Sequence, residues 1–200
     1  MIINGLEKII QLKLVYFGPA LSGKTTSLKC LFKHFGRVKE VSSIENSVNR
    51  TLFFDYGTMF FQNNKWYLKI HIYSTTGQDF YKVTRPITLK ALDGLIFVID
   101  SQVSAFKRNM DSWKELARYL DDQLYTIPKI LAFNKQDKKT KFSYIKFLEQ
   151  IGYKDLQNVE YFFTIALNGE GILISFETLL SMIFKDFYSF EHKRPVCANS

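Results

Sequence analysis

Residues 18–25 combine glycines with a lysine and with residues that carry a hydroxyl group. The segment reads Gly-Pro-Ala-Leu-Ser-Gly-Lys-Thr, with four residues between the two glycines, and the second glycine is followed by lysine and a hydroxyl residue. In such a loop, backbone N–H groups surround a phosphate, the lysine reaches its outer oxygens and the hydroxyl binds Mg²⁺. We therefore predict nucleotide phosphate contacts at Gly18, Pro19, Ala20, Leu21, Ser22, Gly23, Lys24, Thr25 and Thr26. Lys24 is also a candidate catalytic residue, and Thr25 is a candidate ligand of Mg²⁺.

A second polar group, Asn134-Lys135-Gln136-Asp137, follows the short apolar run 130–133, which suits a buried strand. At the end of that strand, Asp137 can accept hydrogen bonds from the N1–H and 2-amino groups of guanine. Adenine lacks this pair of donors and would leave the carboxylate unpaired, at a cost of about 1–3 kcal/mol. We therefore predict GTP or GDP as the ligand, with Asn134, Lys135 and Asp137 around the base. A P-loop kinase for small molecules is the less favoured alternative, because it does not need residues 134–137.

The composition fits one folded domain. Of 200 residues, 46% are hydrophobic and 23% are charged, with 4 Pro and 10 Gly, which excludes a disordered or fibrous chain. No apolar run approaches the roughly 20 residues that span a bilayer. The 2 Cys exclude a disulfide framework. We expect a cytoplasmic protein with a single domain at residues 1–190 and a flexible tail at residues 191–200.

The net charge of +8 is compatible with phosphate-rich ligands, nucleic acid or peripheral contact with an anionic membrane. The basic residues near 138–141 fit a solvated surface, and we expect no specific nucleic acid partner. The last residues, Cys197-Ala198-Asn199-Ser200, have the outline of a prenylation box. Because Asn199 is polar where an aliphatic residue is usual, we expect an unmodified tail.

Apolar runs that suit strands alternate with helical stripes along most of the chain. The expected strands are residues 12–17, 52–61, 66–73, 95–99, 130–133 and 159–164. The expected helices include residues 28–35, 110–124, 144–151 and 176–187, whereas residues 36–50 lose the periodicity and suggest a long loop. This order predicts an α/β fold: a sheet of about six mostly parallel strands, one antiparallel edge strand from a hairpin, and helices on both faces. Ligands of such sheets bind at the carboxyl ends of the strands.

Taken in order, these motifs resemble those of the small Ras-like GTPases, over roughly residues 10–188. Within that class the chain is most similar to the MglA family of prokaryotic gliding-motility and cell-polarity GTPases. Four blocks carry this likeness: residues 18–26, Asn49-Arg50-Thr51-Leu52-Phe53-Phe54-Asp55-Tyr56, Tyr73-Ser74-Thr75-Thr76-Gly77-Gln78-Asp79-Phe80-Tyr81, and residues 93–101. The resemblance implies a Ras-like P-loop GTPase fold and a molecular switch that hydrolyses GTP to GDP with Mg²⁺.

The same resemblance implies roles for residues beyond the phosphate loop. Thr51 would bind Mg²⁺ and the γ-phosphate, and Gln78, directly after Gly77, would orient the attacking water. Arg50 matches an arginine that the family places on the transition state, where such a group contributes about 10³–10⁵ in rate. The simpler alternative for Arg50 is a solvated loop cation. The fifth guanine-contacting segment is matched by Ala166, through its backbone N–H, and Leu167.

Two positions depart from the Ras-like pattern and bear on hydrolysis. Ser74 stands where most of these GTPases have Asp, which removes a carboxylate that holds a magnesium-bound water, although MglA relatives carry Thr there. Ala20 stands where Gly is usual, and its methyl group would lie close to where Gln78 and Arg50 converge. We therefore expect slow or partner-dependent hydrolysis. The alternative is a guanine-nucleotide-binding scaffold with little intrinsic hydrolysis. The resemblance implies a roadblock-fold, MglB-like activating partner, and effectors that the sequence does not identify.

Overall fold

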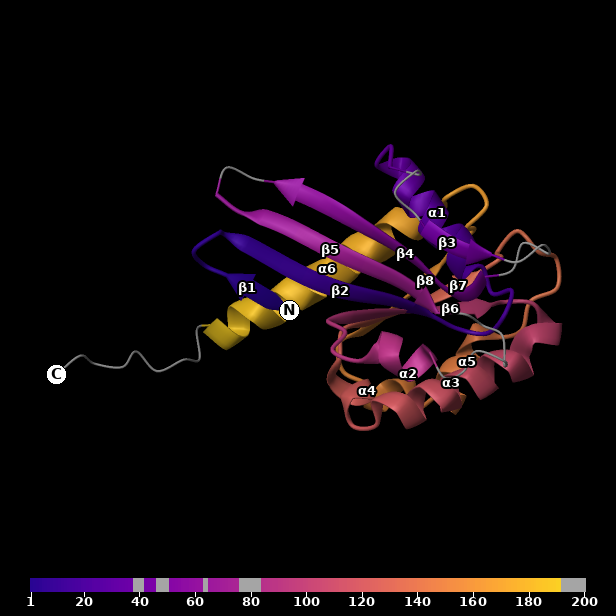
Figure 1. Cartoon of the computed structure of the whole chain (residues 1–200). Helices are drawn as coiled ribbons and strands as arrows, with labels where there is room; N and C mark the ends of the chain where they lie inside the picture. Colours follow the sequence, from indigo (N-terminus) through magenta and orange to yellow (C-terminus); the bar gives the residue numbers. More distant parts are fainter. Residues whose placement is uncertain (38–41, 46–50, 63–64, 76–83, 192–200) are drawn as a thin grey trace.

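The computed structural model describes residues 1–37, 42–45, 51–62, 65–75 and 84–191 of the chain. A single sheet runs through this part of the chain, with helices on both of its faces (Figure 1). Its strands are β1 (Ile2–Asn4), β2 (Ile9–Phe17), β3 (Ser42–Glu45), β4 (Thr51–Gln62), β5 (Tyr67–Thr75), β6 (Gly94–Asp100), β7 (Lys129–Asn134) and β8 (Val159–Phe163). The α/β class predicted from the sequence is confirmed.

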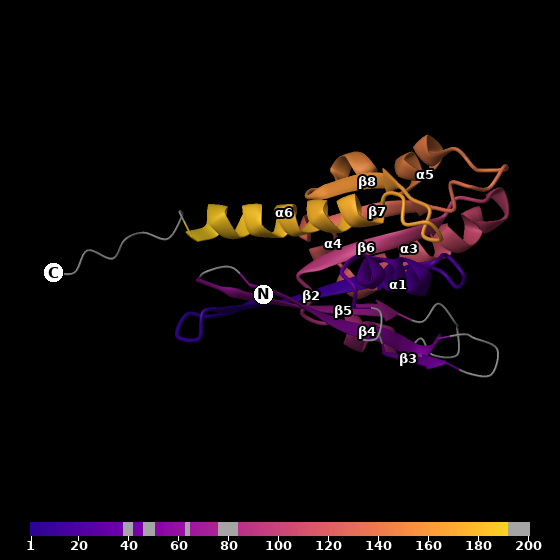
Figure 2. The same ribbon diagram turned by 90° about the horizontal axis from the view of Figure 1, so that it is seen from above.

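The strands follow the order β3-β4-β5-β2-β6-β7-β8, and β1 pairs separately with β2. Figure 2 shows this progression from β8 to the edge formed by β4 and β3. The pairs within β5-β2-β6-β7-β8 are parallel, whereas β1, β3 and β4 pair antiparallel with their neighbours. The hairpin expected at residues 52–73 is β4–β5, so the mostly parallel sheet with an antiparallel edge is confirmed.

Within the described residues, two short strands raise the number of strands above the expected six, to eight. β3 lies within residues 36–50, which we expected to be a loop, and it pairs with β4. Its sequence, Ser-Ser-Ile-Glu, has no run of apolar residues that predicts a strand. Backbone pairing with the neighbouring strand β4 therefore decides its conformation. β1 pairs with β2 at residues 9–11, while β6 pairs with β2 at residues 14–17, so the two occupy different lengths of that strand.

The helices form two layers, one on each face of the sheet (Figures 1 and 2). They are α1 (Lys24–His34), α2 (Thr84–Leu89), α3 (Phe106–Leu120), α4 (Gln123–Thr126), α5 (Tyr144–Gln150) and α6 (Ile172–Glu191), with short 3₁₀ helices at Val103–Ala105 and Tyr153–Asp155. Alternate residues of β2 divide between the two cores, as the strand period requires. Leu14 and Tyr16 pack with α1 and α6, whereas Val15 and Phe17 pack with the core that contains α2 to α5.

The helix expected at residues 110–124 is divided in two. α3 ends at Leu120, and Leu124 belongs to α4. Asp121 between them has φ of +46°, a left-handed conformation that interrupts a helix. Leu120 and Leu124 nevertheless lie in the same core, so the buried stripe was predicted correctly and the continuous helix was wrong. Within the described ranges, no helix has the length and apolar composition that a bilayer crossing requires.

The carboxyl ends of three parallel strands meet at one edge of the sheet. β2 ends at Phe17, β6 at Asp100 and β7 at Asn134, and Asp100 lies opposite Asn134 in the strand register. Each strand end is followed by polar or glycine-rich residues that the sequence analysis associated with ligand binding. The topology therefore brings the loop after β2 and the segment 134–137 together at the edge where ligands of such sheets bind.

Candidate nucleotide site

The loop between β2 and α1 depends on two glycines that have no room for a side chain. Gly18 has φ of +146°, and a Cβ there would lie 2.3 Å from the backbone oxygen of Val98 in β6. Gly23 has φ of +106° and precedes α1, and its Cβ would lie 2.2 Å from Nδ2 of Asn134. These dihedral angles and close approaches favour glycine. The two motif glycines thus let the loop pack against β6 and β7.

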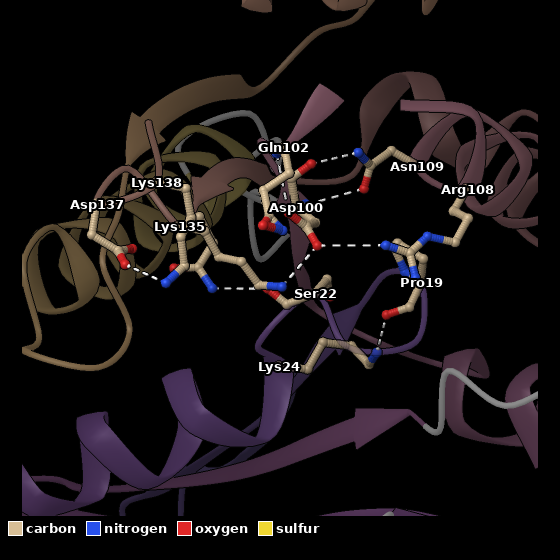
Figure 3. Close-up of polar contacts among 11 residues, drawn as sticks. Pro19, Ser22, Lys24, Asp100, Gln102, Arg108, Asn109, Lys135, Asp137 and Lys138 are labelled. Atoms are coloured by element: carbon tan, nitrogen blue, oxygen red, sulfur yellow. Dashed lines mark hydrogen bonds and ion pairs between the residues drawn. The ribbon is translucent and has the colours of Figure 1, made fainter. Parts of the chain in front are cut away.

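Lys24 begins α1 and turns its ammonium group back over the loop. Nζ donates hydrogen bonds to the carbonyl oxygens of Gly18 at 2.9 Å and Pro19 at 2.7 Å, the latter drawn in Figure 3. Burial, together with the charge of Arg85, lowers the pKa of Lys24 to about 7, and the charge of Asp55 acts in the opposite direction. A phosphate bound in the loop would add negative charge and raise this pKa again.

Thr25 contacts a buried acid that the sequence analysis did not assign to the site. Thr25 Oγ1 donates a hydrogen bond to Oδ2 of Asp55 in β4, at 2.5 Å, and Asp55 is 0% exposed. Ser74 in β5 is also buried, and its hydroxyl has no hydrogen-bond partner among the described residues. Hydroxyl and carboxylate oxygens are the ligands that Mg²⁺ accepts, so this group of side chains fits the ion.

Among the described side chains near Thr25, the possible ligands of a metal ion are hydroxyl groups and the carboxylate of Asp55. The described residues contain no group of three or more His, Cys, Asp or Glu side chains with a metal-binding arrangement. This agrees with the chemistry of Mg²⁺ in nucleotide sites, where one or two protein oxygens act together with water and substrate phosphates.

Asn134 connects three of the segments that the sequence analysis singled out. Its Nδ2 donates to the backbone oxygen of Ser22 at 2.8 Å, and its Oδ1 accepts from the backbone N–H of Ala166 at 3.0 Å and from Thr164 Oγ1 at 3.3 Å. The phosphate loop, residues 134–137 and residues 164–167 therefore converge. The Ala166 N–H, which we predicted to reach a guanine oxygen, donates to Asn134 in this structure, beside the 78%-exposed Leu167.

Lys135 is held by an acid at the end of the neighbouring strand. Its Nζ donates to Oδ2 of Asp100 at 2.7 Å, and Arg108 approaches the same oxygen at 3.6 Å (Figure 3). Asp100 is buried, and its backbone N–H and carbonyl are bonded to the side chain of Asn109. The acid and Asn109 therefore fix the position of Lys135. Asp100 was not proposed as a site residue from the sequence, although it lies in the last of the four blocks that carry the resemblance, residues 93–101.

Asp137 reaches the edge of the site with its side chain 31% exposed. Lys138 Nζ lies 3.0 Å from Oδ2 of Asp137, and this hydrogen bond is the main cause of a lowered pKa for the Asp137 carboxyl. The group is therefore ionised at neutral pH and available as a hydrogen-bond acceptor. This is the charge state that the predicted contact with guanine requires.

A pocket of about 530 Å³ lies between α1 and the loop before α6. Three residues that we predicted to contact nucleotide, Thr26, Ala166 and Leu167, contribute to its lining. Lys29 and Lys33 of α1 line it as well. The pocket thus adjoins the phosphate loop on the side of the guanine segments, and its basic lining suits an anionic ligand.

Several predicted site residues lie outside the described part of the chain. These are Arg50, Gly77 and Gln78, and the tail residue Cys197 lies outside it too. Thr51 begins β4, but its side chain is not among those that the structure describes. The roles assigned to these residues therefore stay predictions.

The sequence model of the ADP-ribosylation factor (Arf) family matches residues 2–183. The chain belongs to this family. One relative is the "Mutual gliding-motility protein MglA" of Myxococcus xanthus (strain DK1622), which is 29% identical over 190 residues, covering 92% of this chain and 96% of the relative. The resemblance to Ras-like GTPases and to MglA is thereby confirmed. As a member of the Arf family the chain is a small GTPase, and the phosphate-loop and base motifs of that class meet at the carboxyl edge of its sheet.

Proposed function

We propose that this Arf-family protein is a cytoplasmic molecular switch that binds guanine nucleotide with Mg²⁺ and hydrolyses GTP to GDP. The observation that carries the proposal is the position of Asn134, which bonds to Ser22 of the phosphate loop and to Ala166 of the last predicted guanine segment. One ligand can therefore contact both the phosphate loop and the guanine segment at Ala166. In this proposal the phosphates are held by residues 18–26. The base is held by Asn134, Lys135, Asp137, Ala166 and Leu167.

Lys24 supplies positive charge to the outer phosphate oxygens. Its two hydrogen bonds to loop carbonyls, at 2.9 and 2.7 Å, would pass to the phosphates. Because the ammonium group is buried, its attraction to an anion exceeds that of a solvated lysine. Thr25 and Thr51 would hold Mg²⁺, which supplies positive charge beside the nucleotide phosphates when it is bound. The buried oxygens around Thr25 support this assignment.

Hydrolysis needs a water molecule in line with the γ-phosphate and positive charge on the transition state. Through the resemblance to MglA, we assign the water to Gln78 and the charge to Arg50. Ala20 adds a methyl group to the loop at this point, so intrinsic turnover is slow and a roadblock-fold partner accelerates it. Residues 36–61 and 74–90 carry the signal of the bound γ-phosphate to effectors.

Equilibrium binding with fluorescent GDP and GTP, followed by single-turnover hydrolysis with Mg²⁺, tests the proposal. GTP and GDP should compete for the site, and ATP should not. Gln78→Leu and Arg50→Ala should keep GTP affinity, and Arg50→Ala should slow turnover by about 10³-fold or more. Lys139→Ala, which removes an exposed cation, is the matched control and should leave turnover unchanged. Equal competition by ATP would contradict the proposed nucleotide class.

A guanine-nucleotide-binding scaffold is the second candidate, and Ser74 favours it. Its buried hydroxyl occupies the position at which most Ras-like GTPases place a carboxylate. If wild type and both variants bind GTP equally and none of them turns it over, the scaffold replaces the switch. If only a roadblock-fold partner restores turnover, the switch is retained and catalysis depends on the complex.

A further inference from the structure

The pocket between α1 and the loop before α6 extends beyond the residues to which we assign the nucleotide. Its lining includes two lysines of α1, Lys29 and Lys33, which the proposed hydrolysis does not use. We propose that this basic part of the pocket binds a phosphate group on the ribose, so that the protein takes guanine nucleotides phosphorylated at the 2′- or 3′-hydroxyl. The inference rests on the proposed function, because it extends the ligand of that same site.

The residues of α1 that line the pocket form one stripe along the helix. Thr26, Lys29, Cys30 and Lys33 follow the spacing i, i+3, i+4, i+7, which places side chains on one helix face. Because a helix rises about 1.5 Å per residue, Lys33 lies about 10 Å along the axis from Thr26. The stripe therefore leads from the phosphate loop, where α1 begins, toward the other end of the helix.

The covalent order of a nucleotide places the ribose at this pocket. We assign the phosphates to residues 18–26 and the base to segments that include residues 166–167, and the ribose joins the base to the phosphates. A nucleotide that contacts both Thr26 and residues 166–167 carries its ribose beside the pocket that these residues line. The 2′- and 3′-hydroxyls are the free positions of that ribose. A phosphate on one of them is thus the group that can reach the lysines of α1.

The charges around the pocket favour such an added phosphate. Lys29 and Lys33 are exposed, and none of the described residues that line the pocket is acidic. Glu170 is next to the lining in the sequence, but it is exposed and does not belong to the lining. The phosphates at the 5′ position are served by Lys24 and the loop N–H groups. The two lysines of α1 therefore supply positive charge in addition to that at the 5′-phosphates.

The walls of the pocket are held in place by the core. α1 and α6 are in contact (Figure 1), and the lining residues Leu31 and Ile172 are buried in the core that these helices share. A Cβ added at Gly169 would lie 3.0 Å from Sγ of Cys30, so the loop before α6 packs closely against α1. The volume of about 530 Å³ suits a small ligand. A preformed pocket of this kind loses little entropy on binding.

Isothermal titration calorimetry of the full-length protein tests the inference. The ligands are GDP and the two guanosine 5′-diphosphates that carry a further phosphate on the 3′- or the 2′-hydroxyl, all at one free Mg²⁺ concentration. At least one isomer should bind about 10-fold more tightly than GDP at low salt, because two exposed lysines attract the added charge. This advantage should shrink as the salt concentration rises.

Variants of α1 locate the added phosphate. Lys29→Gln and Lys33→Gln should each lower the ratio of the Kd for GDP to the Kd for the tighter isomer. The double variant should bring this ratio close to 1. Lys114→Gln, which removes an exposed lysine from α3, is the matched control and should leave the ratio unchanged. If the double variant does not fold by circular dichroism, Lys33→Gln alone decides.

The outcomes separate this inference from the proposed function. If wild type binds GDP and neither isomer binds more tightly, the inference is overturned and the proposed function stands. If an isomer binds more tightly but the folded lysine variants keep the wild-type ratio, the added phosphate lies elsewhere and the inference is wrong. Lys33 would then serve only the last turn of α1, where a cation stabilises the helix. If wild type binds no guanine nucleotide, the proposed function fails, and this inference fails with it.

Discussion

The side-chain nitrogen of Asn134 donates a 2.8 Å hydrogen bond to the backbone oxygen of Ser22, which lies 112 residues earlier in the chain. The oxygen of the same side chain accepts from Ala166, so one amide group joins the phosphate loop to the loop before α6. Because both bonds are buried, the distance between these loops is set by Asn134. The phosphate side and the base side of the proposed site are therefore mechanically connected.

Asn134→Ala should destabilise the protein and weaken nucleotide binding together. It leaves the Ser22 oxygen and the Ala166 N–H without their partner, and we expect the free energy of unfolding to fall by about 2–3 kcal/mol. Urea unfolding followed by circular dichroism measures this change. Asn168→Ala is the control, because Asn168 is exposed and its loss should change stability by no more than about 0.5 kcal/mol. Equal effects of the two substitutions would show that the Asn134 bonds contribute little.

Gly23→Ala should displace the side chain of Asn134. The new methyl group would lie 2.2 Å from Nδ2, so the amide must move and its bond to Ser22 is lost. Gly36→Ala is a matched control, because Gly36 also has a positive φ, +69°, but has no atom within 4 Å of an added Cβ. Both variants bear backbone strain of about 1–2 kcal/mol, and only Gly23→Ala should also lower GDP affinity. Similar GDP affinities in the two variants would contradict this account.

Asp137→Asn should change the base that the protein prefers. The ionised carboxylate accepts hydrogen bonds from guanine, whereas an amide can donate to the 2-carbonyl group of xanthine. We expect GDP affinity to fall about 10- to 100-fold, which corresponds to 1–3 kcal/mol for the unpaired groups, and xanthosine diphosphate affinity to rise. Competition against a fluorescent nucleotide measures both. Lys138→Ala, which removes the ion-pair partner of Asp137 and keeps the carboxylate, should retain the guanine preference.

Lys129 should make the stability of the protein depend on pH above 8. It is 0% exposed, its Nζ donates to the backbone oxygen of Gln157 at 2.6 Å, and burial lowers its pKa to about 8 from 10.5. Between these two values the unfolded chain binds more protons than the folded protein. The free energy of unfolding therefore rises with pH, by at most about 1.4 kcal/mol per pH unit.

The substitution Lys129→Met isolates this contribution, because methionine keeps much of the apolar stem and does not titrate. Urea unfolding across pH 8 to 10.5 should give a shallower rise for Lys129→Met than for wild type. Lys139→Met, at an exposed position, should follow wild type. Identical slopes for all three proteins would exclude a lowered pKa at Lys129.

The parts of the fold and site that were predicted from sequence are those encoded locally. The phosphate loop, the segment after β7 and the alternation of strands and helices are each contained in a few consecutive residues. The contact of Asp55 with Thr25 was missed because it depends on strand register, and a shift of one residue in β4 would turn the acid to the other face. A local signal was present, since Asp55 and the buried Met59 are four residues apart and so share one face of the strand, and an acid is uncommon at an inward position.

Other features were beyond local patterns for related reasons. The ion pair of Lys135 and Asp100 joins residues at the ends of neighbouring strands, so it requires the pairing of β6 with β7. β3 has no periodicity of its own and exists through its hydrogen bonds to β4. In both cases the information lies in which strands are neighbours, and a single segment does not contain it.

The two bonds from Lys24 to carbonyl oxygens make phosphate binding an exchange of acceptors. An anion that enters the loop must replace the oxygens of Gly18 and Pro19 around Nζ, so hydrogen bonds are substituted and their number hardly grows. Bonds to an ionised acceptor are roughly twice as strong as bonds to a neutral one. At Nζ, this difference is what favours an anionic ligand, and a neutral oxygen-rich molecule gains nothing from it. Lys24 thus favours ligands that carry negative charge, such as polyphosphates, over uncharged competitors.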